Sequence, residues 1–238
     1  MKLPIKMICS VLILFVTSEI YSQIDRSGIR TEFNPFRNNI NSLAYTDIPK
    51  EETLKSVISK TKGSQFYDET FRQATISNTK NAFKVRYNAF LDEMEILDGD
   101  AVVFIDKKHQ KHLVSFPTTN IHYKVLKERK DDERIALGYF VQLEENNYLS
   151  LYRKDRKKYV APGSHRPRVN GEFKNARTEF YVETNNSGIA IPLPRKNKDF
   201  AALFSTKRAQ IEAFIQHENI KVQKEADLIK LIKYINNL

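Results

Sequence analysis

The feature that most constrains the fold is a series of short segments between Ser64 and about Asn186 in which apolar and polar residues alternate. Alternation with a period of two, interrupted by turn-forming residues, predicts antiparallel β-strands. The clearest of these segments are residues 82–90, 101–105, 120–126, 137–143 and 147–153. We therefore expect a β-rich antiparallel body at about residues 64–190.

The most distinct hairpin joins residues 137–143 to residues 147–153 across a short polar turn. On the first strand, Tyr139 and Val141 share one face, because successive side chains of a strand point to opposite faces. Both strands carry large apolar side chains on both faces. A hairpin of this kind is expected inside a sheet and not at its edge.

The pattern becomes helical after the body. Residues 199–204 predict a short helix, and Thr206 is placed to cap a second helix. The last helix carries apolar residues at the spacings i, i+3, i+4 and i+7, namely Leu228, Leu231, Ile232 and Ile235. We therefore predict an α+β fold with C-terminal helices at about residues 198–237.

The first 22 residues have the three parts of a secretory signal peptide. Lys2 and Lys6 form a basic start, residues 7–16 are apolar, and the remainder is more polar. The apolar run is too short for a transmembrane helix, which needs about 20 residues. Cys9 lies at the front of the apolar run, which is the wrong place for lipid attachment. We predict export to the periplasm without a transmembrane span, with outer-membrane association or an extracellular location as alternatives.

Behind the signal peptide, residues 23–62 form a polar lead-in with one short predicted helix, and residues 63–238 form one predicted domain. Removal of the signal peptide removes the only cysteine, which excludes disulfides and thiolate chemistry from the mature chain. The formal net charge of the sequence is +10. Such an excess of positive charge favours anionic partners.

Positive charge is densest in residues 153–177, where nine Lys or Arg residues stand against two acidic ones. Arginine binds phosphate and carboxylate groups through paired hydrogen bonds, so we predict an anion-binding segment. Its candidate residues are Arg153, Arg156, Lys157, Lys158, Arg166 and Arg168. A solvated loop that protects a sheet edge is the alternative. The expected partners are an envelope protein or an anionic glycan or lipid, and nucleic acid is not expected outside the cytoplasm.

Two glutamates, Glu93 and Glu95, are predicted on one face of a strand that follows Arg86. A pair of carboxylates can hydrolyse a glycosidic bond if one of them is buried with a raised pKa. The expected arrangement is instead the solvated side of a hairpin, with Arg86 as a neighbouring cation. An exported glycan hydrolase that uses these two glutamates is the alternative function.

Three histidines, His109, His112 and His122, lie close together in the sequence. Convergent imidazoles bind zinc, but a turn that enters a strand would point the first two in different directions. The sequence contains no glycine-rich phosphate loop, nucleophile elbow or zinc-protease helix motif. We therefore predict no metal, no cofactor and no enzymatic activity.

Two stretches resemble a family of uncharacterised exported proteins of Bacteroidota. The first begins at Gly63 and ends with RYNAFLDEMEI, and the second is the closing EADLIKLIKYINNL. Gln65 and Asp68 stand where the family pattern has Pro and Asn. The resemblance covers about residues 63–238. It implies an envelope location and a β-rich body with a helical end, and it brings no known activity.

The expected function is that of a non-enzymatic envelope protein that binds a partner protein or an anionic envelope component. A further candidate surface for a partner is the apolar stripe of the last helix, with Leu228, Leu231, Ile232 and Ile235 as docking residues. Such a stripe docks on another protein only if the molecule's own sheet does not cover it.

Overall fold

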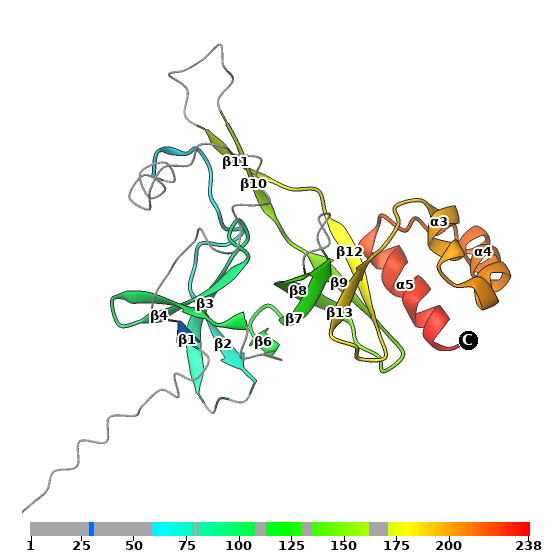
Figure 1. Ribbon diagram of the computed structural model, residues 1–238, viewed down its shortest axis with the longest axis horizontal. Helices are drawn as coiled ribbons and strands as arrows, with labels where there is room; N and C mark the ends of the chain where they lie inside the picture. The colour runs from blue at the N-terminus through cyan, green and yellow to red at the C-terminus, as the bar shows by residue number, and fades with distance from the viewer. Residues whose placement is uncertain are drawn as a thin grey trace, which may run out of the picture.

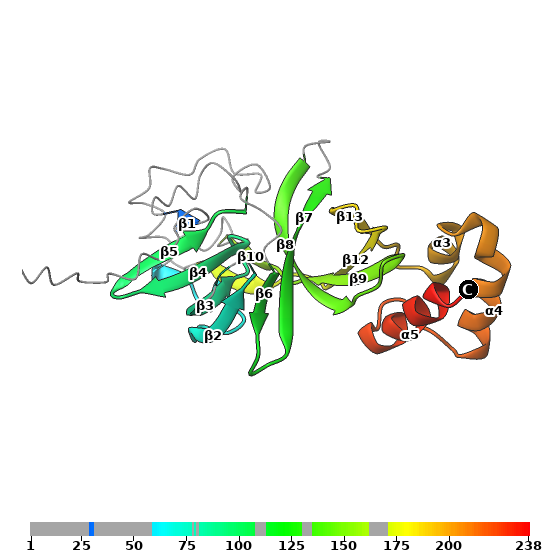
Figure 2. The same ribbon diagram turned by 90° about the horizontal axis from the view of Figure 1, so that it is seen from below.

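The computed structural model describes residues 29–30, 59–77, 79, 81–107, 113–129, 135–161 and 171–238. Strands dominate these residues and helices gather at the C-terminal end, which confirms the predicted α+β class. A sheet, a small barrel and a group of helices follow one another along the molecule (Figures 1 and 2). The predicted signal peptide lies outside the described residues.

The first half of the molecule is an antiparallel sheet, called here the first sheet, with the strand order β1-β5-β4-β3-β2-β6-β7. Its strands are β1 (Ile29–Arg30), β2 (Arg72–Ile76), β3 (Ala82–Asn88), β4 (Glu93–Asp98), β5 (Ala101–Ile105), β6 (Leu113–Phe116) and β7 (Ile121–Arg129). Within the predicted polar lead-in, Ile29 and Arg30 pair with Ile105 and Phe104 of β5.

The second half is a closed barrel of five strands. These are β7, β8 (Ile135–Glu144), β9 (Leu149–Lys154), β12 (Glu179–Thr184) and β13 (Ile189–Pro192). Each strand pairs antiparallel with the next, and β13 pairs with β7 to close the ring. The closing pair is parallel, because the first and fifth strands of an up-and-down series run in the same direction. Closure leaves β8 between two neighbours, which confirms that the predicted hairpin lies inside the sheet.

The inside of the barrel is filled by one buried apolar or aromatic residue from each strand. These residues are Leu126, Phe140, Tyr152, Tyr181 and Ala190. The opposite face of β8 carries Tyr139 and Val141, which pack in the core of the first sheet. The strands β7 and β8 therefore belong to both halves and hold them together.

A two-stranded hairpin, β10 (Lys157–Val160) with β11 (Glu172–Asn175), is inserted between two barrel strands, β9 and β12. It extends away from the barrel in Figure 1. The described part of the basic segment 153–177 comprises the end of β9, this hairpin and the residues beside them.

The C-terminal helices are α3 (Asn197–Ala202), the 3₁₀ turn η4 (Ser205–Lys207), α4 (Arg208–His217) and α5 (Glu225–Asn236). The predicted capping role of Thr206 is wrong, since Thr206 lies within η4 and the cap position of α4 is Lys207. The helices cover the outer face of the barrel, where Leu151 and Val182 meet α5 in one apolar cluster.

The apolar stripe of α5 is part of this core. Its four residues, Leu228, Leu231, Ile232 and Ile235, have no exposed surface. The docking role predicted for them is therefore wrong. The physical reason is that the outer wall of the barrel is itself apolar and covers the stripe, so none of it remains for a partner.

Candidate functional site

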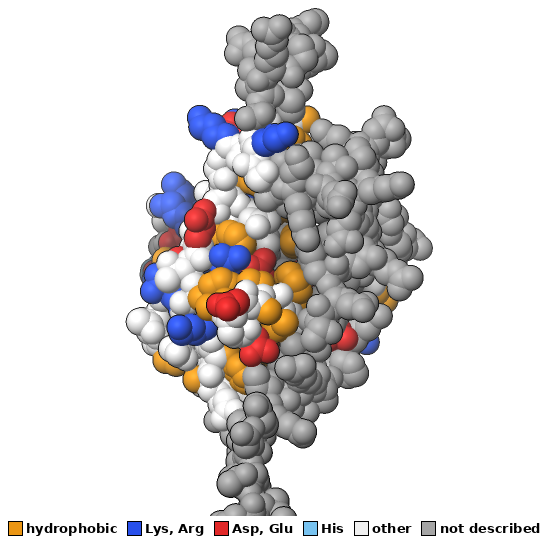
Figure 3. All heavy atoms as spheres, turned by 90° about the vertical axis from the view of Figure 1, so that its left-hand side faces the viewer, with side chains coloured by type: hydrophobic (Ala, Val, Ile, Leu, Met, Phe, Trp, Pro, Cys, Tyr) orange, Lys and Arg blue, Asp and Glu red, His pale blue; other side chains and the backbone are white. Residues whose placement is uncertain are grey.

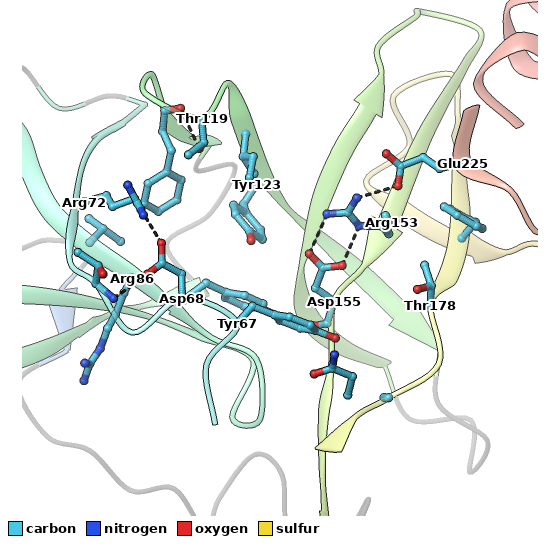
Figure 4. Close-up of a pocket in the computed structure, with 18 of the residues that line it drawn as sticks. Tyr67, Asp68, Arg72, Arg86, Thr119, Tyr123, Arg153, Asp155, Thr178 and Glu225 are labelled. Carbon is cyan, nitrogen blue, oxygen red and sulfur yellow. Dashed lines mark hydrogen bonds and ion pairs between the residues drawn. The ribbon is translucent and has the colours of Figure 1, made fainter. Parts of the chain in front are cut away.

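A cleft of about 600 Å³ lies between the first sheet and the barrel. Strands β2, β3 and β7 contribute one wall, and β9, β12 and the start of α5 contribute the other (Figure 4). Residues from both halves meet here. A concave site where two folding units meet is a common place for a ligand.

Tyrosines form the aromatic part of the cleft. The rings of Tyr87 and Tyr123 lie 4.9 Å apart, and both side chains are buried. The Tyr87 hydroxyl donates a hydrogen bond of 2.7 Å to Asp92. Burial raises the pKa of Tyr87 well above its usual value, and the neighbouring Asp92 charge adds to the effect, so the hydroxyl remains a donor. Tyr67, in contrast, is 49% exposed and presents its ring to the cleft.

The charged groups of the cleft are paired with one another. Arg72 contacts Asp68 at 2.5 Å, and Arg153 contacts Asp155 and Glu225 at 2.7 Å each (Figure 4). Hydrogen bonds from the Thr70 backbone and from Arg72 lower the pKa of Asp68. The cleft therefore offers fixed donors and acceptors with little net charge.

Behind the cleft lies a buried ion pair at one end of the barrel. Lys154 of β9 is 1% exposed, and its Nζ lies 2.8 Å from Asp92 Oδ2 and 2.8 Å from the Tyr139 carbonyl. Burial would raise the pKa of Asp92, but the charges of Lys107 and Lys154 lower it to about 2. Burial lowers the pKa of Lys154 to about 8. Both groups are therefore charged at neutral pH.

Gly138 of β8 makes room for this ion pair. A Cβ atom at this position would lie 2.5 Å from Lys154 Nζ and 2.9 Å from Asp92 Oδ2. The φ angle of Asp92 is +57°, a left-handed conformation that turns its carboxylate towards the barrel. The ion pair thus depends on the absence of a side chain at Gly138 and on the left-handed backbone conformation of Asp92.

Of the predicted anion-binding residues, Arg153 and Arg156 are committed to carboxylates inside the molecule. Arg156 forms ion pairs with Glu128 and Glu179. The Tyr181 hydroxyl donates to the same Glu128 at 2.9 Å, so this network joins β7, β12 and the link between β9 and β10. Each of these two arginines is held by two carboxylates of the protein. Their observed role is therefore to stabilise the fold, and not to bind a ligand.

The remaining candidates of that segment fall into two groups. Lys157 lies over the ring of Tyr67, with its Nζ 4.7 Å from the ring centre, and Lys158 is exposed on β10. Arg166 and Arg168 lie outside the described residues. The predicted anion-binding role of the segment stays a prediction.

The predicted carboxylate pair is buried and is not on a solvated hairpin face. Glu93 and Glu95 are each 4% exposed. Glu95 accepts hydrogen bonds from Arg86 at 2.7 Å and from Asn88 at 2.8 Å, which confirms Arg86 as its neighbour. The Arg86 guanidinium lies 4.0 Å from the centre of the Phe66 ring and 4.2 Å from that of Phe71. This stacking explains why Glu95 is covered.

Neither glutamate lines the cleft. A general acid must reach its substrate, so this position favours a structural role for Glu95. Asp92 lies in the turn before β4.

The histidines do not form a described metal site. His122 lies 2.9 Å from Ser115 Oγ, and His109 and His112 lie outside the described residues. Within the part of the chain that the structure describes, no group of three or more His, Cys, Asp or Glu is arranged to hold a metal ion.

The cleft residues Tyr67, Tyr123 and Arg72 were not predicted as a site. Tyr67 belongs to the first of the two family-like stretches, which was the only sequence signal for it. At the first-sheet end of the molecule, described charged side chains of both signs lie among hydrophobic ones (Figure 3). The net positive charge is therefore not gathered as a single patch on the described part of that face.

Comparisons of the chain with protein-family models, with curated proteins and with solved structures give no match. The resemblance to exported proteins of Bacteroidota stays a prediction. Among the described helices, none is both long enough and apolar enough to cross a membrane.

Proposed function

We propose that this chain is an exported, non-enzymatic binding protein of the cell envelope, and that it holds a glycan chain in the cleft between the first sheet and the barrel. The observation that carries the proposal is the composition of this cleft. The exposed ring of Tyr67 lines one side of the cleft, and polar groups that are paired with one another line its interior.

Sugars match these two properties. The aromatic face of a tyrosine packs against the apolar C–H face of a sugar ring, while its hydroxyl remains available for hydrogen bonds. The Tyr67 hydroxyl donates to the Arg156 carbonyl at 3.0 Å, so the ring is held in place before a ligand arrives. A preorganised ring loses little conformational entropy on binding.

The state of the acidic groups supports binding over hydrolysis. A glycosidase needs one carboxylic acid that keeps its proton near neutral pH. In the cleft, Asp155 and Glu225 both contact Arg153, and the pKa of Asp68 is lowered. Asp68 is therefore suited to accepting hydrogen bonds from sugar hydroxyls and not to donating a proton to a leaving group, and the other two carboxylates are engaged by Arg153.

The proposal is tested by measuring the affinity of the purified protein for soluble envelope polysaccharides, with Tyr67→Ala as the variant. We expect Tyr67→Ala to weaken binding about tenfold, which corresponds to about 1.4 kcal/mol. No turnover of the polysaccharide is expected, as measured by the release of reducing ends.

The matched control is Tyr148→Ala. Tyr148 is 42% exposed and lies beside Lys207, away from the cleft, so its removal changes the same kind of surface. Equal loss of affinity in both variants, or an absence of polysaccharide binding by the unmodified protein, contradicts the proposal. Release of reducing ends would favour the hydrolase alternative.

A further inference from the structure

A second cavity of about 140 Å³ adjoins the cleft and shares Thr178, Phe180 and Gln223 with it. Arg195, from the segment between β13 and α3, lines this cavity. Gln223 comes from the segment between α4 and α5. Residues far apart in the sequence therefore meet at one end of the cleft.

Two arginines converge here on one neutral acceptor. Arg177 Nη2 lies 3.4 Å and Arg195 Nη2 lies 3.5 Å from the same atom, Gln223 Oε1. Arg195 Nη1 lies 3.4 Å from the Thr178 carbonyl. All three distances are at the long end for hydrogen bonds, which are usually about 2.7–3.2 Å. Arg195 Nε is buried and has no hydrogen-bond partner among the described residues.

The carboxylates around this cavity are occupied by other cations. Glu179, which lines the cavity, contacts Arg156 at 2.8 Å and also accepts from Tyr181. Glu225 at the neighbouring end of the cleft contacts Arg153 at 2.7 Å. Within the described chain, neither Arg177 nor Arg195 forms an ion pair. Two positive charges thus face one amide oxygen.

The geometry points to a site for a phosphate-type oxyanion at Arg177 and Arg195, where oxygens of the anion take the place of Gln223 Oε1. Guanidinium groups bind such anions through charge-assisted hydrogen bonds that are shorter and stronger than those to a neutral amide. The Gln223 side chain is exposed, and its Nε2 donates a hydrogen bond of 3.1 Å to the Arg195 carbonyl. It can turn into solvent when the anion binds and exchange this hydrogen bond for one to water.

This inference rests on the proposed function, because the anion is assigned as a substituent of the glycan in the cleft. The cavity and the cleft share three residues, so a chain in the cleft can place an acidic group between the two arginines. The ligand class is accordingly a phosphorylated glycan, and a neutral glycan would fill the cleft alone.

The test compares the affinities of the full protein for one oligosaccharide in its phosphorylated and unmodified forms, with inorganic phosphate as a competitor. Gln223→Glu places a fixed carboxylate between the two arginines, so we expect it to weaken binding of the phosphorylated form at least tenfold. Because Gln223 also lines the cleft, the unmodified form serves as the reference, and its affinity is expected to fall much less than that of the phosphorylated form, since a neutral sugar is not repelled by the added charge. Gln216→Glu, which adds the same charge at an exposed position of α4, is the matched control.

The outcomes separate this site from the cleft itself. If Tyr67→Ala weakens both sugars while Gln223→Glu and Gln216→Glu behave alike, the anion site is overturned and the glycan cleft stands. Failure of inorganic phosphate to compete with the phosphorylated form also overturns the site. If Arg195→Gln instead abolishes flotation of the protein with phosphatidylglycerol vesicles and leaves glycan affinity unchanged, the glycan source of the anion is wrong.

Discussion

Four of the arginines near the cleft fall into two pairs that differ in what neutralises them. Arg153 and Arg156 each contact two carboxylates of the protein. Arg177 and Arg195 share one amide oxygen. The first pair holds strands and a helix together, whereas the second keeps unused hydrogen-bonding capacity. Arginines near one cleft can therefore serve two purposes.

The largest effect is expected from breaking the first pair. Arg156→Met removes one of the cations that face Glu128, which is 5% exposed in the barrel wall. Loss of one partner of a buried ion pair costs about 3 kcal/mol of unfolding free energy. Urea denaturation monitored by tyrosine fluorescence measures this loss.

A second substitution tests whether charge or packing causes the loss of stability in Arg156→Met. Glu128→Gln in the Arg156→Met background removes the carboxylate that has lost this cation and should restore more than half of the lost stability. If the double variant is as unstable as the single one, lost packing and not charge explains the effect.

The next largest effect is the acid sensitivity of the buried charges at the barrel end. The folded-state pKa of Asp92 is about 2, below the usual value of 3.8, so its ionised form stabilises the fold above about pH 4. This contribution, about 2 kcal/mol, is lost as the pH falls from about 4 to about 2. Denaturation midpoints across this range should show a steeper decline for the unmodified protein than for Asp92→Asn.

The smallest effect on the stability of the protein is expected from substitutions at the second pair of arginines. Arg195→Gln should change the unfolding free energy by less than about 0.5 kcal/mol, because partly exposed charges without an ionic partner contribute little. Gln223→Glu should raise stability by up to about 1 kcal/mol at low salt, since it supplies the missing carboxylate. Thermal denaturation at low and high salt measures both, and a loss as large as that of Arg156→Met would remove the distinction between the pairs.

Local patterns in the sequence predicted local structure well. The hairpin of β8 and β9 and the stripe of α5 follow from periods of 2 and 3.6, which depend only on neighbouring residues. The burial of Glu95 did not follow, because it is covered by Arg86 stacked between Phe66 and Phe71. The alternation of residues along a strand does not show which side chains from other segments pack against its face.

The sequence by itself determined the α+β class, the strand-rich body and the amphipathic character of α5. Only the tertiary structure decided that the stripe of α5 is core and that five strands close into a barrel. It also decided which arginines have carboxylate partners. The physical reason is that each of these outcomes depends on residues far apart in the chain, such as Arg153 with Glu225, whose meeting is set by packing and not by local periodicity.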